Sequence, residues 1–206
     1  NLKQGNTLVL IENFPLSDDA FESFINTIGV SIIENRNNNR KAVFDVKIVK
    51  QNSFFESIAN SNLAFPLHTD CADFNSIPNC IGLLCVEPAS LQQGESSFMF
   101  LNKVVNQLSE NKIEELLNKK WKFRNQSRSI LMLENKTYKI CYDRITMESF
   151  SEISKIEIDE LNKLDELFES NSFDIKLKKG GLVLFRNDLL LHGRKGIDID
   201  SNRLIK

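Results

Sequence analysis

Short apolar segments, each bounded by turn-forming residues, recur along this chain of 206 residues. A clear example runs from Cys80 to Val86; it is too short for a core helix and is stopped by Glu87 and Pro88. Segments of this kind predict the strands of an antiparallel sheet, whereas a series of parallel strands would need a helical crossover between each pair. We therefore expect a β-rich core with helices packed outside it.

Strands and helices alternate irregularly in this prediction. Strands are expected at 7–11, 42–49, 80–86, 97–100, 121–123, 129–133, 138–142, 173–177, 182–185 and 197–205. Apolar residues at helical spacing predict helices at 18–28, capped by Ser17, at 102–119 with a break near Ser109, and at 156–168, with a shorter candidate at 54–58 and a polar loop at 35–40. The pattern predicts an α+β fold with a jelly-roll core, a double-stranded β-helix of antiparallel strands, and flanking helices in one domain of residues 1–206.

Composition and charge narrow the functional classes. The 26 basic and 28 acidic residues are interspersed and leave a net charge of -2, so no basic stripe for nucleic acid is expected. No segment approaches the roughly 20 apolar residues of a membrane span, and the first residues lack the layout of a signal peptide, so we expect a cytoplasmic protein. The four cysteines form no C-x-x-C pair, which predicts reduced, mostly buried thiols.

The chain has only two histidines, His68 and His192. In an extended strand, His68 and Asp70 project from the same side and are able to bind one ion together. Two imidazoles and one carboxylate with other positions open are typical of Fe(II) sites for O2 chemistry, although zinc accepts the same ligands. A histidine packed in the core is the plain alternative for His192, which follows three leucines.

Two other chemistries find no support in the sequence. A His/Asp pair serves nucleophilic catalysis in some enzymes, but no G-x-S-x-G or comparable nucleophile motif accompanies it. The glycines at Gly94 and at Gly180 and Gly181 do not lie in a phosphate-binding motif.

Three motifs in a fixed order indicate a family. They are the HTD triplet at 68–70, the segment QGES at 93–96, and GLVLFRNDLLLHGR at 181–194, which is followed by RLIK at 203–206. This order resembles the TauD/TfdA-like family of Fe(II)/2-oxoglutarate-dependent dioxygenases, in particular the branch of clavaminate-synthase-like and γ-butyrobetaine-hydroxylase-like enzymes. The resemblance extends from about Asn62 to the end of the chain.

The resemblance implies a role for each matching residue. His68, Asp70 and His192 match the iron ligands of the family. Arg203 matches the arginine that holds the distal carboxylate of the cosubstrate 2-oxoglutarate, a task that suits a planar, two-pronged cation. Ser96 stands where the family often has a hydroxyl near the same cosubstrate; the plain alternative is a turn serine.

Arg194 is a second candidate for contact with cosubstrate or substrate. Three departures from the family pattern accompany these matches. Gln93 stands where a second glycine is usual, Arg186 stands where an Asp is common, and the chain stops before a second arginine that often follows the first.

The resemblance also implies a reaction. Iron held by three protein ligands keeps three positions for 2-oxoglutarate and O2, and the expected result is oxidation of a C–H bond, by hydroxylation or desaturation. Because Asp70 is present, the position that is open for halide in related halogenases is filled.

The expected substrate is a small polar metabolite such as an amino acid or a derivative, free or attached to a carrier protein. The alternatives are a non-oxidative metal enzyme and a catalytically silent binding protein on the same barrel.

Overall fold

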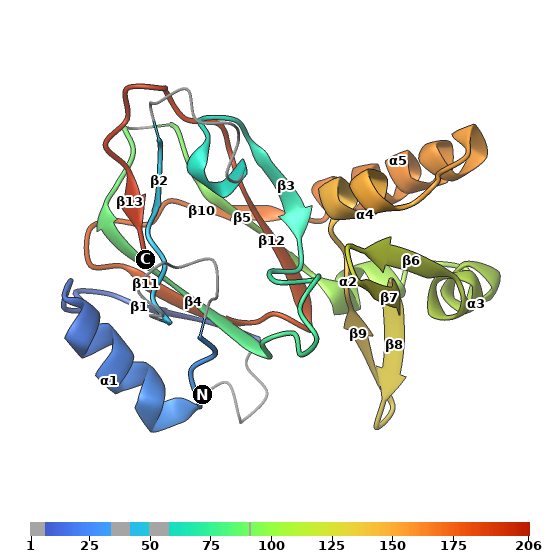
Figure 1. Ribbon diagram of the computed structural model, residues 1–206, viewed down its shortest axis with the longest axis horizontal. Helices are drawn as coiled ribbons and strands as arrows, with labels where there is room; N and C mark the ends of the chain where they lie inside the picture. Colours follow the sequence, from blue (N-terminus) through green and yellow to red (C-terminus); the bar gives the residue numbers. More distant parts are fainter. Residues whose placement is uncertain (1–6, 34–41, 50–57, 91) are drawn as a thin grey trace.

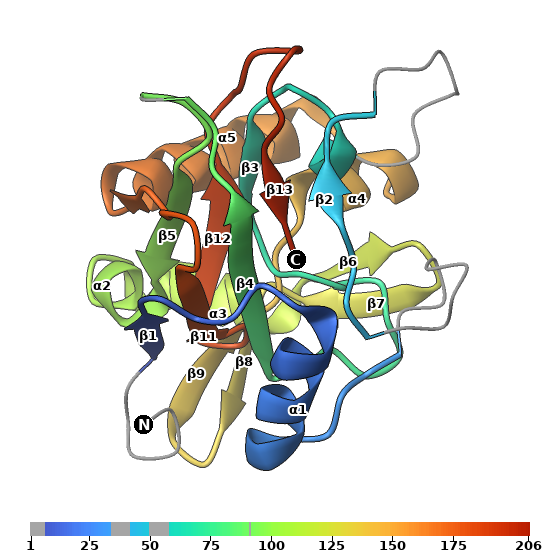
Figure 2. The same cartoon turned by 90° about the vertical axis from the view of Figure 1, so that its left-hand side faces the viewer.

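The structure, a computed structural model, describes residues 7–33, 42–49, 58–90 and 92–206. Its centre consists of two antiparallel sheets (Figures 1 and 2). One has the strand order β1 (Leu8–Ile11), β11 (Leu182–Arg186), β4 (Cys80–Glu87), β13 (Leu204–Ile205) and β2 (Val46–Lys47). The other has the order β10 (Phe173–Ile175), β5 (Ser96–Phe100), β12 (Leu190–Arg194) and β3 (Phe65–His68). The predicted antiparallel, mixed α and β architecture is confirmed.

Strand β11 shows how the sheets acquire their two apolar faces. Val183 and Phe185 pack into a cluster that also takes side chains from β5 and β12 of the other sheet, so they face the space between the sheets. Leu182 and Leu184 belong to a separate cluster on the outer face. Successive residues of a strand point to opposite sides of the sheet. A strand that is covered on both faces therefore needs a continuous run of apolar residues, as β11 has from Leu182 to Phe185.

Helix α1 (Asp18–Ile28) provides the outer cover. Its N-terminus is capped by the Ser17 side chain, which accepts a hydrogen bond from the Ala20 amide, and Gly29 follows its last turn, as predicted. Phe21 is its buried residue and packs against the five-stranded sheet.

A long insert lies between β5 and β10 and occupies the right-hand side of Figure 1. Its elements are α2 (Leu101–Val105), α3 (Glu110–Asn118), β6 (Lys120–Phe123), β7 (Gln126–Ser129), β8 (Leu131–Glu134), β9 (Thr137–Ile140), α4 (Arg144–Phe150) and α5 (Lys155–Ser170). Strands β6 and β7 form one hairpin, and β8 and β9 form another. The largest apolar cluster joins this insert to the four-stranded sheet through Leu67, Met99 and Leu191. The insert is thereby packed directly against the strands that carry the two histidines.

Several predicted boundaries are corrected by the structure. The break at Ser109 is confirmed, since its side chain caps α3. The strand predicted at 129–133 is two strands, β7 and β8, and helix α4 was not predicted. Strands β2 and β13 cover two residues each within the predicted 42–49 and 197–205.

Two further predictions are not tested in full. The loop at 35–40 lies outside the described residues. So does most of the candidate helix at 54–58, and a single 3-10 turn, η2 (Ile58–Asn60), follows it.

All four cysteines carry free thiols, as predicted, but only two of them are buried. Cys85 and Cys141 lie in the core, Cys71 is half-buried and Cys80 is exposed at the start of β4. Burial raises the pKa of the Cys141 thiol to about 12, so this group stays protonated and packs as a small apolar residue. Within the described ranges, no helix has both the length and the apolar character needed to cross a membrane.

Candidate functional site

The alternation of strand β12 directs the candidate residues to the inside of the molecule. Leu190 packs in the core between the two sheets, so His192 and Arg194, two and four residues later, point toward the same side. The neighbouring strand β5 places Phe98 opposite His192 and Ser96 opposite Arg194. One histidine, one arginine and one serine among the predicted residues therefore share the inner face of the four-stranded sheet.

The second histidine comes from the strand on the other side of β12. His68 is the last residue of β3 and is paired in register with His192. Their ring centroids lie 4.3 Å apart. The Phe65 ring stacks on His68 at 3.9 Å, and the Phe185 ring lies 4.9 Å from His192. Two imidazoles separated by more than 120 residues in sequence thus lie side by side between aromatic rings.

The surroundings of the two rings differ. The Nδ1 atom of His68 lies 2.9 Å from the Pro66 carbonyl oxygen; since a carbonyl only accepts, Nδ1 donates this hydrogen bond, which leaves Nε2 as the ring nitrogen for an ion. Burial, together with the neighbouring His68, lowers the pKa of His192 well below the usual value, so this ring is neutral. Its Nδ1 atom is buried and has no hydrogen-bonding partner among the described residues.

Gly193 explains how β3 approaches His192 so closely. A Cβ atom at this position would lie 2.7 Å from the Phe65 carbonyl oxygen and 3.2 Å from the Leu67 amide nitrogen. The pairing of β12 with β3 changes register between His192 and Arg194, which is where Gly193 stands. A residue without a side chain is required here because the two backbones are in contact.

Asp70 lies beyond the end of β3, so it does not share an extended strand with His68. The chain turns at Asp70, and Cys71 adopts a positive φ of 56°. The Asp70 carboxylate accepts a hydrogen bond of 3.0 Å from the Cys71 amide. Among the described residues, no three His, Cys, Asp or Glu side chains are gathered so as to hold a metal ion. The structure brings the two histidines together and leaves the Asp70 carboxylate turned toward Cys71.

The chemistry of these donors still fits Fe(II). Two imidazoles and one carboxylate are the ligand types of the two-histidine, one-carboxylate site. The Nδ1 atom of His192, which lacks a partner among the described residues, is a buried polar atom of the kind that a ligand or ion satisfies. The Asp70 carboxylate is held by the amide and the weak thiol donor of Cys71, which leaves lone pairs for an ion.

Arg203 is buried just before strand β13, with an exposed fraction of 6%. Within the part of the chain that the structure describes, no carboxylate forms an ion pair with it. Burial and the nearby charge of Arg194 lower the pKa of Arg203 to about 10. At neutral pH Arg203 is therefore a desolvated cation with no counter-ion in the described part of the chain, which is an environment suited to a ligand carboxylate.

Arg194 is placed differently, although it is also buried. Its guanidinium donates to the carbonyl oxygens of Ala59 and Ser61 at 2.8 Å each and of Leu63 at 2.6 Å. These bonds hold the segment that leads into β3. Burial lowers the pKa of Arg194, and its Nε is buried and lacks a hydrogen-bonding partner among the described residues.

Ser96 and Gly94 lie beside the arginines. Ser96 is the first residue of β5 and is almost fully buried, so it is not a turn serine. Gly94 has a positive φ of 63°, and a Cβ atom there would lie 2.5 Å from the Ile197 side chain and 3.2 Å from Cδ of Arg203. The QGES segment thus has a glycine at the position where the aliphatic part of the Arg203 side chain contacts the backbone of this segment.

The two residues that depart from the family pattern are both engaged in bonds. The Gln93 side chain donates to the Asp198 carboxylate at 2.7 Å and accepts from the Asp198 amide at 3.0 Å, joining the loops before β5 and β13. Arg186 forms a two-pronged ion pair with Asp188, with bonds of 2.8 and 2.7 Å. Neither departure removes a candidate ligand.

Two residues next to the ligands have roles that the sequence did not predict. The Thr69 amide donates to the Tyr142 carbonyl oxygen at 2.6 Å, and the Thr69 hydroxyl accepts from the Tyr142 amide at 3.1 Å. The Asn187 side chain bonds to the backbone of Asp70, 117 residues away. No local pattern signals such contacts, because both partners are distant in sequence.

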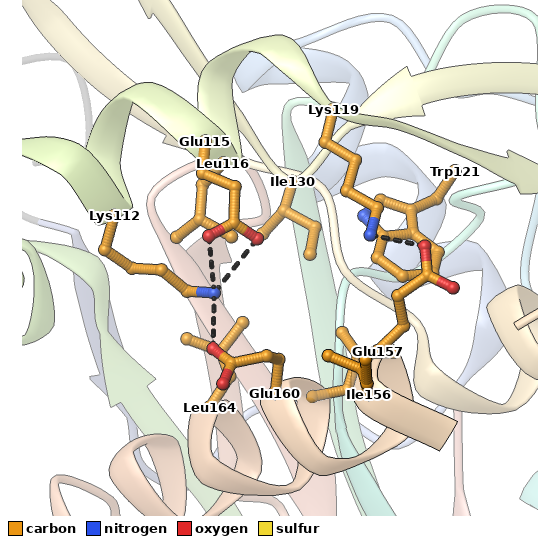
Figure 3. Close-up of a pocket in the computed structure, with 11 residues that line it drawn as sticks. Lys112, Glu115, Leu116, Lys119, Trp121, Ile130, Ile156, Glu157, Glu160 and Leu164 are labelled. Carbon is orange, nitrogen blue, oxygen red and sulfur yellow. Dashed lines mark hydrogen bonds and ion pairs between the residues drawn. The ribbon is translucent and has the colours of Figure 1, made fainter. Parts of the chain in front are cut away.

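A cavity of about 290 Å³ lies in the insert, between α3 and α5 (Figure 3). Lys112 bridges Glu115 and Glu160, and Lys119 pairs with Glu157 while lying over the Trp121 ring. Its charged groups are paired with one another, and it contains none of the candidate ligands. We therefore assign the site to the inner face of the sheets.

Comparison with known proteins identifies the family of the chain. The family model described as taurine catabolism dioxygenase TauD, TfdA family, matches residues 1–206, including the part before Asn62 that showed no motif. No curated protein sequence matches the chain.

Solved structures share the fold at low sequence identity. Asparagine oxygenase (AsnO) has a TM-score of 0.80 at 14% identity over 99% of this chain and 73% of its own. PvcB from Pseudomonas aeruginosa has a TM-score of 0.73 at 16% identity over 99% and 75%. The non-heme iron oxygenase OrfP, in complex with Fe, succinate and (3S)-hydroxy-L-Arg, has a TM-score of 0.73 at 10% identity over 99% and 76%.

Proposed function

This chain belongs to the TauD/TfdA family and is a 2-oxoglutarate-dependent non-haem iron oxygenase, and on that premise we propose that His68, Asp70 and His192 hold its Fe(II). The observation that carries the assignment is the pair of imidazoles, in register on adjacent strands with ring centroids 4.3 Å apart. Asp70 completes the ligand set when its carboxylate turns from Cys71 toward the histidines. When bound, Fe(II) and 2-oxoglutarate supply the activation of O2 that oxidises a C–H bond.

The protein contributes orientation and exclusion of water. The Pro66 carbonyl fixes the tautomer of His68, and the stacked Phe65 ring fixes its plane. Phe185 and Phe98 close the inner face around His192. An apolar surround of this kind keeps bulk water away from a reactive site.

We assign the distal carboxylate of 2-oxoglutarate to Arg203. The guanidinium is buried and charged, and it lacks an ion-pair partner among the described residues, so binding a carboxylate compensates its lost hydration. Ser96, buried on the inner face opposite Arg194, supplies a hydroxyl for the same carboxylate. Arg194 has one donor, Nε, that no other described residue engages, and this donor is available for a contact with cosubstrate or substrate.

The strand connections support a finer fold assignment. Successive strands β2 to β5 and β10 to β13 alternate between the two sheets, which is the order of a double-stranded β-helix in a single domain. The helical and hairpin insert then interrupts this jelly roll once, between β5 and β10. We propose this arrangement as the scaffold that positions the iron ligands.

The ligands of the similar structures support a proposal for the substrate class. Asparagine oxygenase was determined with Fe(II), 2S,3S-3-hydroxyasparagine and succinate, and OrfP with hydroxylated arginine. We propose that this enzyme hydroxylates an amino acid or a derivative, free or attached to a carrier protein.

Succinate formation tests this function. The protein, loaded anaerobically with Fe(II) and 2-oxoglutarate, is exposed to air with each of the common amino acids in turn. Stimulated succinate release together with the mass of one added oxygen atom supports the proposal. Turnover with zinc in place of iron would establish the non-oxidative alternative. A protein that binds neither metal nor 2-oxoglutarate would be the silent binding protein.

A further inference from the structure

The Asn187 side chain is fully buried, and both its oxygen and its nitrogen form hydrogen bonds with backbone groups of other residues. Its Oδ1 accepts from the Asp70 amide at 2.9 Å, and its Nδ2 donates to the Asp70 carbonyl oxygen at 3.0 Å. The same Nδ2 donates to the Pro78 carbonyl oxygen, also at 3.0 Å. We propose that Asn187 is the positioning residue for Asp70 as a metal ligand, an inference that rests on the proposed iron site.

The location of Asp70 explains why such a residue is needed. Strand β3 ends at His68, so no strand ladder holds the backbone of Asp70, and the chain turns there with a positive φ at Cys71. The amide of Asn187 replaces the missing ladder, since it accepts from the N–H and donates to the C=O of the same residue, as a paired strand does. Its bond to Pro78 also closes the loop that begins at Asp70.

Asn187 is itself held firmly in the frame that carries His192. Its backbone N–H donates to the Asn79 carbonyl oxygen at 2.9 Å. Its two chain neighbours, Arg186 and Asp188, form an ion pair with each other. It stands five residues before His192, between β11 and β12. The position of the Asp70 backbone is therefore fixed relative to His192, which leaves the rotation of the Asp70 side chain as the remaining freedom of the third ligand.

A direct contact of Asn187 with metal or substrate does not fit this arrangement. Both amide hydrogens are donated to carbonyl oxygens, and the carbonyl oxygen of the side chain accepts from Asp70. A residue of this kind acts through the ligand that it orients, and loss of such an orienting partner typically weakens metal affinity about 10- to 100-fold.

The test uses Co(II), an oxygen-stable substitute for Fe(II), titrated into the protein and followed by its visible absorption. In Asn187→Asp the side chain keeps its shape and its acceptor but loses both donors. We expect its Co(II) affinity to fall at least tenfold. Arg144→Met is the matched control: it removes the hydrogen bonds from the Arg144 guanidinium to Asp165 and Asn162 within the insert, so it should lower the thermal midpoint without changing Co(II) affinity.

A double-mutant cycle separates positioning from general loosening of the structure. In an Asp70→Ala background the third ligand is absent, so Asn187→Asp should cause no further loss of Co(II) affinity. A further loss of the same size in that background, or an unchanged affinity in folded Asn187→Asp, would overturn the inference. If Asn187→Asp does not fold, Asn187→Gln, which retains the donors on a longer stem, is measured in the same cycle with the same criteria. Absence of Co(II) and Fe(II) binding by the unsubstituted protein would instead reject the proposed iron site.

Discussion

His68 and His192 are direct register partners on the antiparallel strands β3 and β12, with ring centroids 4.3 Å apart. Residues that lie directly opposite each other on paired strands point to the same face of the sheet, so both rings lie on one face. The backbone contact at Gly193 allows β3 to lie close to β12. The relationship converts two distant sequence positions into one pair of nitrogen donors.

Replacing either histidine with alanine should abolish substrate-coupled succinate formation. Each variant removes one nitrogen donor, while the aromatic and aliphatic packing of the two sheets remains. Circular dichroism should show an intact fold in both variants. Undiminished succinate formation by His192→Ala would remove this residue from the ligand set.

Arg203→Ala should raise the 2-oxoglutarate concentration needed for half-maximal rate. Loss of one side of a desolvated charge pair costs about 2 to 5 kcal/mol, whereas a solvated arginine would cost almost nothing. Fe(II) affinity without cosubstrate should stay unchanged, because the guanidinium is assigned to the far end of 2-oxoglutarate. If the cosubstrate dependence is unaltered, Arg194→Ala is the next variant to measure. An unchanged 2-oxoglutarate requirement in both variants would reject the proposed carboxylate site.

Gly193→Ala should lower both stability and metal affinity. Its Cβ would lie 2.7 Å from the Phe65 carbonyl oxygen, so β3 has to shift, at a cost of about 1 to 3 kcal/mol. The shift moves His68 away from His192. Gly29→Ala is the control, since nothing lies within 4 Å of a Cβ there and its φ is -166°. Urea unfolding and Co(II) titration measure the two effects, and equal behaviour of the two variants would contradict the close approach.

The ion pairs between α3 and α5 should make stability depend on acid pH. Hydrogen bonds from Lys119 and Ser154 lower the pKa of Glu157 from 4.5 to about 2, and bonds from Lys163 and Lys112 lower that of Glu160 likewise. Because the folded-state pKa values lie below the unfolded one, this contribution is full above about pH 4.5 and disappears toward pH 2.

The double variant Glu157→Gln and Glu160→Gln should therefore show a flatter dependence of the urea midpoint on pH in this range. The effect should be small and decrease with added salt, since both carboxylates are solvent-accessible. An unchanged pH dependence would show that these pairs add nothing to the stability of the insert.

The sequence predicted the central strands because their pattern is local. Strands such as β4 and β11 are covered on both faces and therefore read as continuous apolar runs. Strand β3 was not predicted, since its four residues include Pro66 and follow an irregular polar stretch. The turn at Asp70 also lacked a signal, because Cys71 adopts a positive φ without the glycine or asparagine that usually marks one.

The candidate ligands were predicted from motif order, but their support was not. The contacts of Thr69 with Tyr142 and of Asn187 with Asp70 span 73 and 117 residues, and each depends on the packed tertiary structure. The burial of Arg203 without an ion-pair partner among the described residues is likewise a property of the fold. Assignment of His68, Asp70, His192, Ser96, Arg194 and Arg203 to their roles remains a prediction that the experiments above test.

The most direct test of the iron site is a crystal structure of the protein grown anaerobically with Fe(II) and 2-oxoglutarate, with anomalous data collected at the iron edge. We predict one strong iron peak bound by His68 and His192, with the Asp70 carboxylate turned away from Cys71 to complete the ligand set and the cosubstrate reaching toward Arg203. An iron peak bound elsewhere, or a peak at the histidines with neither Asp70 carboxylate oxygen bound to the iron, would contradict the assignment.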